Sequence, residues 1–294
     1  MLRHPTVPTS MLLAALFAAG ASAQKPTFEW QKRTATLDYG SVPLGKHSLA
    51  ELPVGGSWRL GANQATVLRL AMPAIVGEAV VAPGAYTVQL QRTGEVACAL
   101  VSAEGVRIDG PLGKAAKPTK KLVIDWLKDG APKASSQAAK LVVQFGENEW
   151  SGAMTFPGSK TVPAGGWKLT AFHLPAALVA ARGSKPVPVA ALQKDDESGF
   201  NLMLGKDDAQ LTPWSKPAAM GRPGAGAPAA TEADAGTTGA VEALTLDKPT
   251  SRTHVELLKA SLSKGELVVE LAFGDEAVRV KAPEPKDGKD AKGK

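Results

Sequence analysis

The chain has 294 residues, a formal net charge of +6 and one cysteine. This length allows one large domain or two smaller ones with a hydrophobic core. The excess of positive charge is mild, and no concentrated patch combines basic with aromatic side chains, so the composition does not favour nucleic-acid binding. A single cysteine excludes an internal disulfide, and the fold must therefore depend on its core.

The N-terminus has the pattern of a secretion signal. Arg3 precedes an uncharged apolar run over residues 11–19, and Ala21-Ser22-Ala23 is the small-x-small sequence that signal peptidase needs. We predict that residues 1–23 are removed, which leaves a net charge of +5 because only Arg3 is lost. The apolar run is shorter than the roughly 20 residues of a membrane-spanning helix, so we expect no transmembrane segment and a periplasmic or extracellular protein.

Short segments of alternating apolar side chains, separated by Gly, Pro, Asn and Asp, follow one another along the mature chain. Sustained helical spacing of apolar residues is absent, although residues 252–263 are ambiguous. We therefore predict an all-β fold, an antiparallel β-sandwich. The expected strands are Arg33–Tyr39, Thr66–Met72, Ala85–Gln91, Glu95–Val101, Lys121–Leu127, Lys140–Phe145, Gly166–His173, Val241–Leu246, Glu266–Phe273 and Glu276–Lys281.

One long interruption divides the predicted strands. Residues 182–240 are expected to form an irregular insertion, and from residue 216 they consist almost entirely of Pro, Ala, Gly, Thr and isolated charges, which predicts disorder. We expect residues 241–281 to return and complete the single domain begun by residues 24–181, because alone they are too few to fold. The charged tail 282–294 is expected to be disordered and solvated.

Two segments share one pattern, a Pro/Gly turn that leads an aromatic residue into an alternating strand. They are Val81–Val88 and Val162–Leu169. The similarity has two explanations, a duplicated β unit or the same turn chemistry used twice.

The usual signatures of catalytic and metal sites are missing or incomplete. Residues 40–47 resemble a phosphate-binding loop, but His47 replaces the Ser or Thr that holds magnesium, and the chain has neither G-x-S-x-G nor H-E-x-x-H. His47, His173 and His254 lack partners at metal-ligand spacing, and the acidic residues at 195–197 and 207–208 lack the spacing of a calcium loop. We predict no catalytic residue, metal or cofactor. The period of two in the segment 95–100 places Cys98 on one face with Val96 and Leu100, which indicates a buried thiol.

The run from Leu52 to Thr66 brings an aromatic side chain, a guanidinium and an amide together around small residues. In one interpretation Trp58 closes one end of the sandwich core, and Arg59 forms hydrogen bonds with carbonyls or a carboxylate at the edge of that core. Gly61-Ala62-Asn63 then forms a tight turn. In the other, Trp58, Arg59 and Asn63 line a cleft together with Tyr39 and Tyr86. An aromatic platform, a cation and an amide are what a glycan or a small anionic ligand requires.

This run and its surroundings resemble the bacterial domain-of-unknown-function 2911 family over residues 34–90. The residues that match the family's pattern are Tyr39, Pro43, Gly45-Lys46, Leu52-Pro53, Gly55, Trp58-Arg59, Gly61-Ala62-Asn63, Ala65-Thr66 and Pro83–Val88. Gln64 stands where the family usually has Glu, Val54 where it has Tyr, and Lys46 where it has Arg. A neutral amide still forms hydrogen bonds, so binding survives the change at residue 64 more easily than acid–base catalysis does. The resemblance implies an exported β-rich protein and supplies no established reaction.

These observations together predict an exported protein whose function is non-catalytic binding or a structural role in the cell envelope. The first alternative is a hydrolase that acts on envelope or extracellular glycans, and the second is a purely structural or assembly module. A pair of carboxylates about 5–9 Å apart beside Trp58 would favour glycoside hydrolysis.

Overall fold

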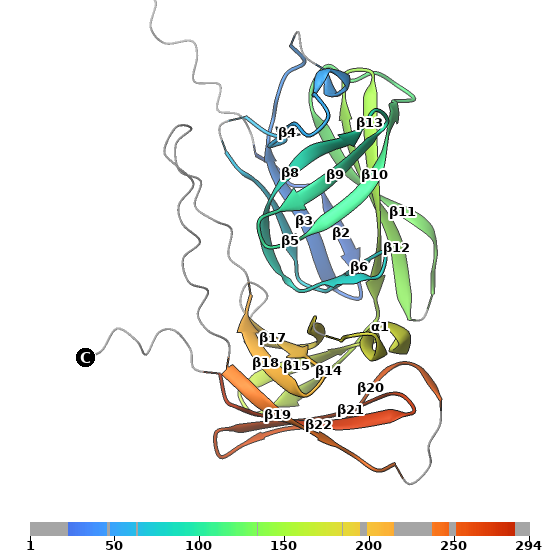
Figure 1. Ribbon diagram of the computed structural model, residues 1–294. Coiled ribbons are helices and arrows are strands. Elements are labelled where there is room, and N and C mark those ends of the chain that lie inside the picture. Colours follow the sequence, from blue (N-terminus) through green and yellow to red (C-terminus); the bar gives the residue numbers. More distant parts are fainter. Residues whose placement is uncertain are drawn as a thin grey trace, which may run out of the picture.

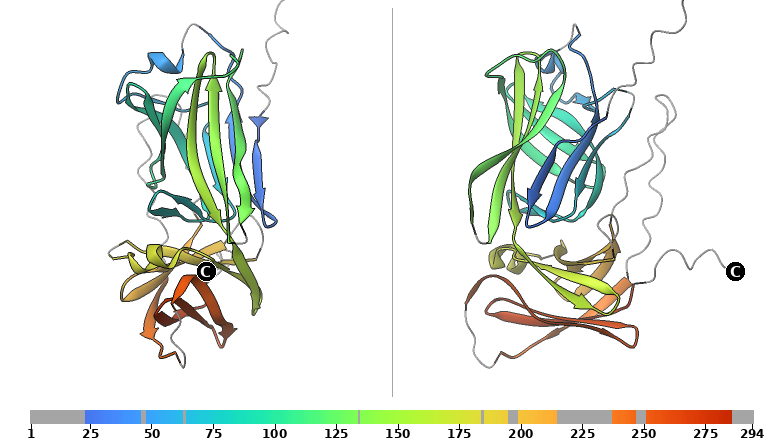
Figure 2. Two further views of the ribbon diagram at one scale, coloured as in Figure 1. Left: turned by 90° about the vertical axis from the view of Figure 1, so that its right-hand side faces the viewer. Right: turned by 180° about the vertical axis from the view of Figure 1, so that it is seen from behind.

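The computed structural model describes residues 23–45, 48–62, 64–133, 135–183, 185–194, 199–214, 237–246 and 251–285. These residues form two antiparallel sheets, each rolled into a barrel-like shape around its own core, and the two lie one above the other (Figure 1). The predicted all-β, antiparallel class is confirmed. We call residues 23–157 the N-terminal unit and residues 159–285 the C-terminal unit; both can be followed from two further directions in Figure 2.

The N-terminal unit contains thirteen strands and one short 3-10 helix, η1 (Leu49–Glu51), in its described residues. The main path of the sheet runs β1-β3-β5-β8-β9-β10-β13-β12-β11. The strands are β1 (Ala23–Gln24), β2 (Thr27–Trp30), β3 (Arg33–Gly40), β4 (Ser57–Trp58), β5 (Thr66–Leu70), β6 (Ala74–Val76), β7 (Ala79–Val81), β8 (Gly84–Gly94), β9 (Ala97–Ser102), β10 (Arg107–Lys114), β11 (Val123–Lys133), β12 (Ser136–Phe145) and β13 (Asn148–Pro157).

The C-terminal unit contains nine strands, in the order β14-β15-β16-β17-β18-β19-β22-β21-β20, and the short helix α1 (Ala176–Ala180), again counted over the described residues. The first and last strands of this order approach each other, because β20 also contacts β14 and β15. The strands are β14 (Ser159–Ala164), β15 (Trp167–Phe172), β16 (Val187–Gln193), β17 (Gly199–Leu204), β18 (Asp208–Pro213), β19 (Thr237–Ala243), β20 (Arg252–Ser263), β21 (Glu266–Gly274) and β22 (Glu276–Pro283).

Alternation along the strands separates the core of the N-terminal unit from its surface. In β13, Trp150, Met154 and Phe156 are buried while Ala153 is exposed, as the period of two in a strand requires. The Trp150 indole donates a hydrogen bond of 3.0 Å to the carbonyl oxygen of Cys98, which satisfies its polar group inside the core. The thiol of Cys98 is buried as predicted, and burial raises its pKa.

Three strands lie where we expected an irregular insertion. β16, β17 and β18 occupy residues 187–213 and form the middle of the second sheet. Residues 188–193 are buried without interruption, so both faces of β16 are covered and the alternation typical of a half-exposed strand is missing. The part of the expected insertion between residues 215 and 236 lies outside the described residues.

The strands that we assigned to one domain divide between the two units. The chain passes from the first sheet to the second at Gly158, and residues 241–281 complete the second sheet. Each set of strands has enough apolar side chains for a core of its own. The predicted signal peptide, apart from Ala23 in β1, and the tail beyond residue 285 lie outside the described residues.

The two Pro/Gly-aromatic segments have different structures. Residues 162–169 belong to a hairpin of β14 and β15. Residues 81–88 instead connect β7 to β8, which pair with β6 and β5 and not with each other. The shared pattern therefore reflects similar turn chemistry more than a repeated hairpin.

Polar contacts join the two units. The Arg33 guanidinium donates a hydrogen bond to the Thr170 hydroxyl at 2.5 Å, and the buried Asn201 amide donates to the carbonyl oxygen of Pro83 at 2.9 Å. Ile75 and Val80 of the N-terminal unit pack against the core of the C-terminal unit. No helix among the described residues is long and apolar enough to cross a membrane.

Candidate functional site

A pocket of about 450 Å³ lies at the end of the N-terminal unit that is farther from the C-terminal unit, at the top in Figure 1. Its wall comes from the segment between β3 and β5 and from the end of β12. Most of its side chains are apolar, and Glu51, Ser48 and Ser57 are the polar ones among the described residues. The lining residues are Val42, Pro43, Gly45, Ser48, Leu49, Glu51, Leu52, Pro53, Ser57, Trp58 and Phe145.

Two aromatic side chains from distant parts of the sequence meet in the wall. Trp58 lies in β4, which pairs with β8 opposite Leu90, and Phe145 ends β12. The two ring centroids are 5.1 Å apart and the planes are tilted by 41°, within the range of favourable aromatic contacts. Trp58 is half-buried and packs on the core, so its ring is part of both the core and the pocket.

The rim of the pocket at η1 is held by Arg92 of β8. Its guanidinium donates hydrogen bonds to the carbonyl oxygens of Ala50 and, at 2.8 Å, of Leu52. The same group donates to the carbonyl oxygens of Gly94 at 3.0 Å and Glu95 at 2.7 Å. A planar group with several donors satisfies four carbonyls at once, and it thereby ties the rim to the turn between β8 and β9.

Sequence reasoning missed Arg92. It stands in the polar run Gln91-Arg92-Thr93-Gly94, which has the composition of a solvated strand end. Its partners are main-chain carbonyls, two of them some forty residues earlier in the chain and two of them two and three residues later. A main-chain acceptor can belong to any residue type, so the sequence does not reveal it.

The small residues of the Leu52–Thr66 run have structural explanations. Gly55 has a φ of +85°, and its amide donates a 2.8 Å hydrogen bond to the carbonyl oxygen of Arg92. Gly61 lies against the backbone of Gly40, and a Cβ at Gly40 would come within 2.2 Å of the carbonyl oxygen of Ala62. These close approaches account for the glycines without a ligand.

Tyr39 and Tyr86, which we expected to line a cleft, are buried in the core. The Tyr39 hydroxyl donates to the Gln24 side chain at 2.6 Å and accepts a 3.1 Å hydrogen bond from the Ile124 amide. Burial raises the pKa of Tyr39, against the opposing effect of the Ile124 hydrogen bond. The Tyr86 hydroxyl donates to the carbonyl oxygen of Ala82 at 2.6 Å.

Of the five predicted ligand-binding residues, Trp58 alone is among the described residues that line the pocket. The side chain of Arg59 is exposed, and neither a hydrogen bond nor an ion pair joins it to another described residue. Asn63 lies outside the described residues. The other residues of the pocket were not predicted to bind a ligand. Pro43, Gly45, Leu52 and Pro53 belong to the pattern shared with the family, whereas Leu49 and Phe145 lie outside it.

Other clusters of reactive side chains are few. In the part of the chain that the structure describes, no three His, Cys, Asp or Glu side chains are placed to hold a metal ion. His173 lies near His254, and burial, together with this neighbour and Lys160, lowers its pKa. The acidic group at 195–197 and His47 lie outside the described residues.

No family model, no curated protein and no solved structure matches the chain. The resemblance of residues 34–90 to the domain-of-unknown-function 2911 family therefore stays a prediction. What the pocket does must be argued from its own chemistry.

Proposed function

We propose that this protein is an exported, non-catalytic binding protein that holds a small molecule in the pocket of its N-terminal unit. The observation that carries the proposal is the pocket itself, with a volume of about 450 Å³ and a mainly apolar wall around Trp58 and Phe145. Small-molecule sites have volumes of roughly 300–1,000 Å³ and are lined mostly by apolar and aromatic side chains with a few polar groups.

The composition of the wall favours binding over hydrolysis. Glu51 is the sole titratable side chain among the described lining residues, whereas glycoside hydrolysis uses a pair of carboxylates. The hydrolase hypothesis therefore has less support than binding. The apolar wall also favours a ligand with a large apolar surface over a glycan, whose hydroxyls need many polar partners.

Export is the second half of the proposal, and it rests on the sequence of residues 1–23. The signal-like pattern, with its cleavage sequence at Ala21-Ser22-Ala23, supports a periplasmic or extracellular location. The intact mass of the protein recovered from the periplasm or the medium tests this directly. We expect a chain that begins at Gln24, and a chain in that fraction that begins at Met1 would refute the predicted cleavage.

A ligand screen with a blocked pocket tests the binding proposal. A ligand that binds only the native state raises the unfolding midpoint by mass action, so decanoate, 1-decanol, glycans and sugar phosphates are compared by thermal unfolding. Ser57 is exposed on β4 and lines the pocket, so Ser57→Trp should fill the mouth and abolish the shift. Ser263→Trp, at an exposed position of β20, is the matched control and should retain it.

Two outcomes contradict the proposal. If no compound raises the unfolding midpoint, the pocket does not bind small molecules of these classes. If Ser57→Trp leaves the shift unchanged, the ligand binds elsewhere.

A further inference from the structure

A loop rich in lysines lies beside the pocket. It joins β10 to β11 over residues 114–121, and we call it the lysine loop. Lys114, Lys117, Lys120 and Lys121 are all exposed, and no acidic residue interrupts them. No ion pair joins any of the four to another residue that the structure describes. Clustered cations raise the local concentration of anions. One exposed carboxylate, that of Glu147, lies beside the loop, since the Ala115 amide donates a 2.8 Å hydrogen bond to the carbonyl oxygen of Glu147.

Main-chain hydrogen bonds fix the lysine loop to the pocket wall. The Leu44 amide donates to the carbonyl oxygen of Lys120 at 2.9 Å, and the Leu122 amide donates to the carbonyl oxygen of Val42 at 2.7 Å. Pro43, between them, pairs with Lys121. Since Val42 and Pro43 line the pocket, the last two lysines of the loop follow its wall.

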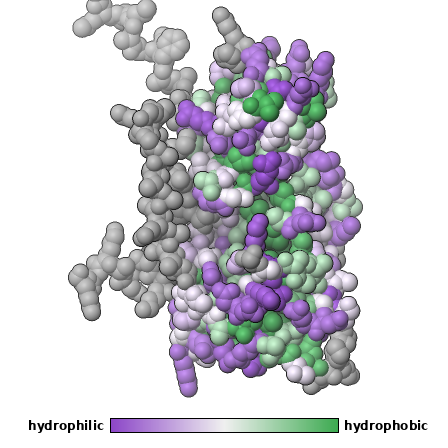
Figure 3. All heavy atoms as spheres, viewed as in Figure 1, coloured by the Kyte–Doolittle hydropathy of each residue, from purple (hydrophilic) through white to green (hydrophobic). Residues whose placement is uncertain are grey.

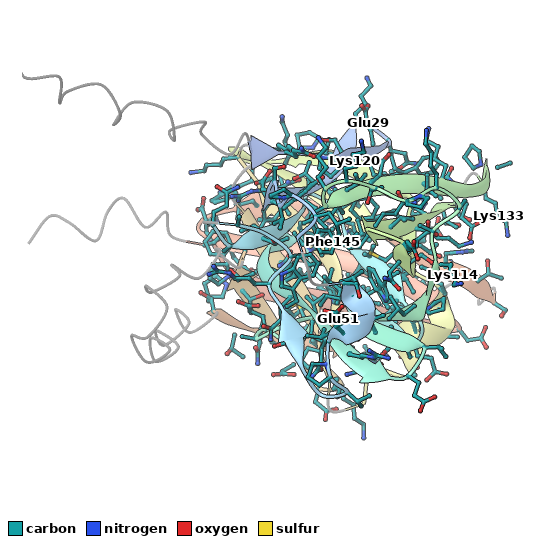
Figure 4. The ribbon with its side chains drawn as sticks, turned by 90° about the horizontal axis from the view of Figure 1, so that it is seen from above. Glu29, Glu51, Lys114, Lys120, Lys133 and Phe145 are labelled. Atoms are coloured by element: carbon teal, nitrogen blue, oxygen red, sulfur yellow. The ribbon has the colours of Figure 1, made fainter. Side chains whose placement is uncertain are left out.

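The loop is also fixed on the side of the aromatic pair. The Thr119 amide donates a 2.9 Å hydrogen bond to the carbonyl oxygen of Gly146, the residue after Phe145. Seen from above, Phe145 lies between Lys120 and Glu51 (Figure 4). In this view Lys120 is on the other side of Phe145 from Glu51, whereas Lys114, at the start of the loop, lies to the right of both.

Two large apolar side chains are exposed in the segments that line the pocket. Leu44 and Val54, each next to a lining residue, are 42% and 61% exposed, although large apolar side chains are usually covered. Figure 3 shows green apolar patches among purple hydrophilic side chains at this upper end of the molecule. The end of the N-terminal unit therefore combines an apolar pocket, an apolar rim and a cationic loop.

We propose that the ligand of the pocket is a single-chain amphiphile with an anionic head, whose chain lies in the pocket while its head lies at the lysine loop. This inference rests on the proposed function, because it names the chemistry of the ligand for that same pocket. The chain gains from leaving water, by about 0.8 kcal/mol for each buried methylene. The head stays hydrated at the rim and is attracted by the lysines, so no charge is buried.

Three probes with the same chain separate the contribution of the pocket from that of the charge. They are decanoate, 1-decanol and decyltrimethylammonium, titrated into the mature protein below their aggregation concentrations by isothermal titration calorimetry at pH 8. We expect decanoate to bind about five- to tenfold more tightly than 1-decanol, since each exposed charge pair contributes about 0.2–1 kcal/mol. We expect decyltrimethylammonium to bind most weakly, and added salt to reduce the preference for decanoate.

Charge-reversal variants locate the head. Lys117→Glu with Lys120→Glu should weaken decanoate binding about tenfold and leave 1-decanol binding unchanged. Lys185→Glu with Lys259→Glu, two exposed lysines of the C-terminal unit, is the matched control and should change neither. If the charge-reversed protein does not fold, Lys117→Gln with Lys120→Gln makes the same comparison, with a smaller expected loss of decanoate affinity.

The outcomes distinguish this inference from the proposed function. If decanoate and 1-decanol bind equally, or if the lysine variants leave the decanoate affinity unchanged, the proposed anionic head is wrong, whereas the proposal that the pocket binds a small molecule still holds. Failure of all three probes overturns both. Sedimentation with vesicles of phosphatidylcholine and phosphatidylglycerol separates a free amphiphile from a membrane surface, and cosedimentation that the charge reversal abolishes would replace the proposal with membrane docking.

Discussion

The guanidinium of Arg92 donates a hydrogen bond of 2.8 Å to the carbonyl oxygen of Leu52, forty residues earlier in the chain. Leu52 lines the pocket and Arg92 belongs to β8, so this contact joins the pocket rim to the central sheet of the N-terminal unit. A rim held in place before a ligand arrives lowers the entropic cost of binding.

Arg92→Ala should loosen this rim and weaken binding. The change leaves four carbonyl oxygens without their donor, and we expect a loss of about 1–3 kcal/mol in the free energy of unfolding, together with weaker binding of decanoate. Arg107→Ala is the control, because Arg107 is exposed and its guanidinium contacts the carboxylate of Asp109, which is exposed as well. Equal effects of the two changes, measured by chemical denaturation and calorimetry, would refute a specific role for Arg92.

Trp58→Ala should affect both stability and binding, because the ring contacts the core and the pocket. Replacing a fully buried Trp with Ala lowers the free energy of unfolding by about 3–5 kcal/mol, and for this half-buried ring we expect a loss of about 2 kcal/mol. Trp214→Ala removes a buried ring of the C-terminal unit and should destabilise the protein without changing decanoate affinity. If the Trp58→Ala protein is as stable as the parent and binds decanoate with the same affinity, Trp58 has no role in the binding site.

Tyr39→Phe should destabilise the protein without altering the ligand affinity. The change leaves the buried Ile124 amide without its hydroxyl acceptor, at a cost of about 1–2 kcal/mol. Gln24→Ala removes the other, partly buried partner and should cost less. Weaker ligand binding in Tyr39→Phe, measured by calorimetry, would instead favour the cleft that we first expected from Tyr39 and Trp58.

His173 should make the fold more stable at neutral than at mildly acidic pH. Burial, His254 and Lys160 lower its folded pKa below the unfolded value of about 6.5, with Glu256 opposing them. The unfolded chain then binds more protons in this window, so the contribution is complete above the unfolded pKa and is lost as the pH falls through the folded pKa. The free energy of unfolding of His173→Gln should depend less on pH between 5 and 7 than that of the parent protein. If the two free energies changed with pH to the same extent, the assignment would be contradicted.

The sequence alone predicts the class of the fold because strands such as β12 and β21, which we expected over residues 140–145 and 266–273, alternate along much of their length. β13 was not among the expected strands, although its buried side chains also alternate. The sequence does not predict β16, because both of its faces are covered and its apolar residues do not alternate with polar ones. Trp58 stood out by its motif and lines the pocket. Phe145 and Arg92 could not be found this way, since one meets Trp58 only through the folded sheet and the other bonds to main-chain atoms.

Photo-crosslinking tests the central claim most directly, because it reports where a ligand lies. Decanoic acid with a diazirine on its chain is irradiated with the mature protein, and the modified residues are mapped by mass spectrometry. We expect labels on pocket residues, above all Leu49, Leu52, Trp58 and Phe145, and expect 1-decanol in excess to suppress them. Labels confined to the C-terminal unit, or labels at the pocket that persist in Ser57→Trp, would contradict the account.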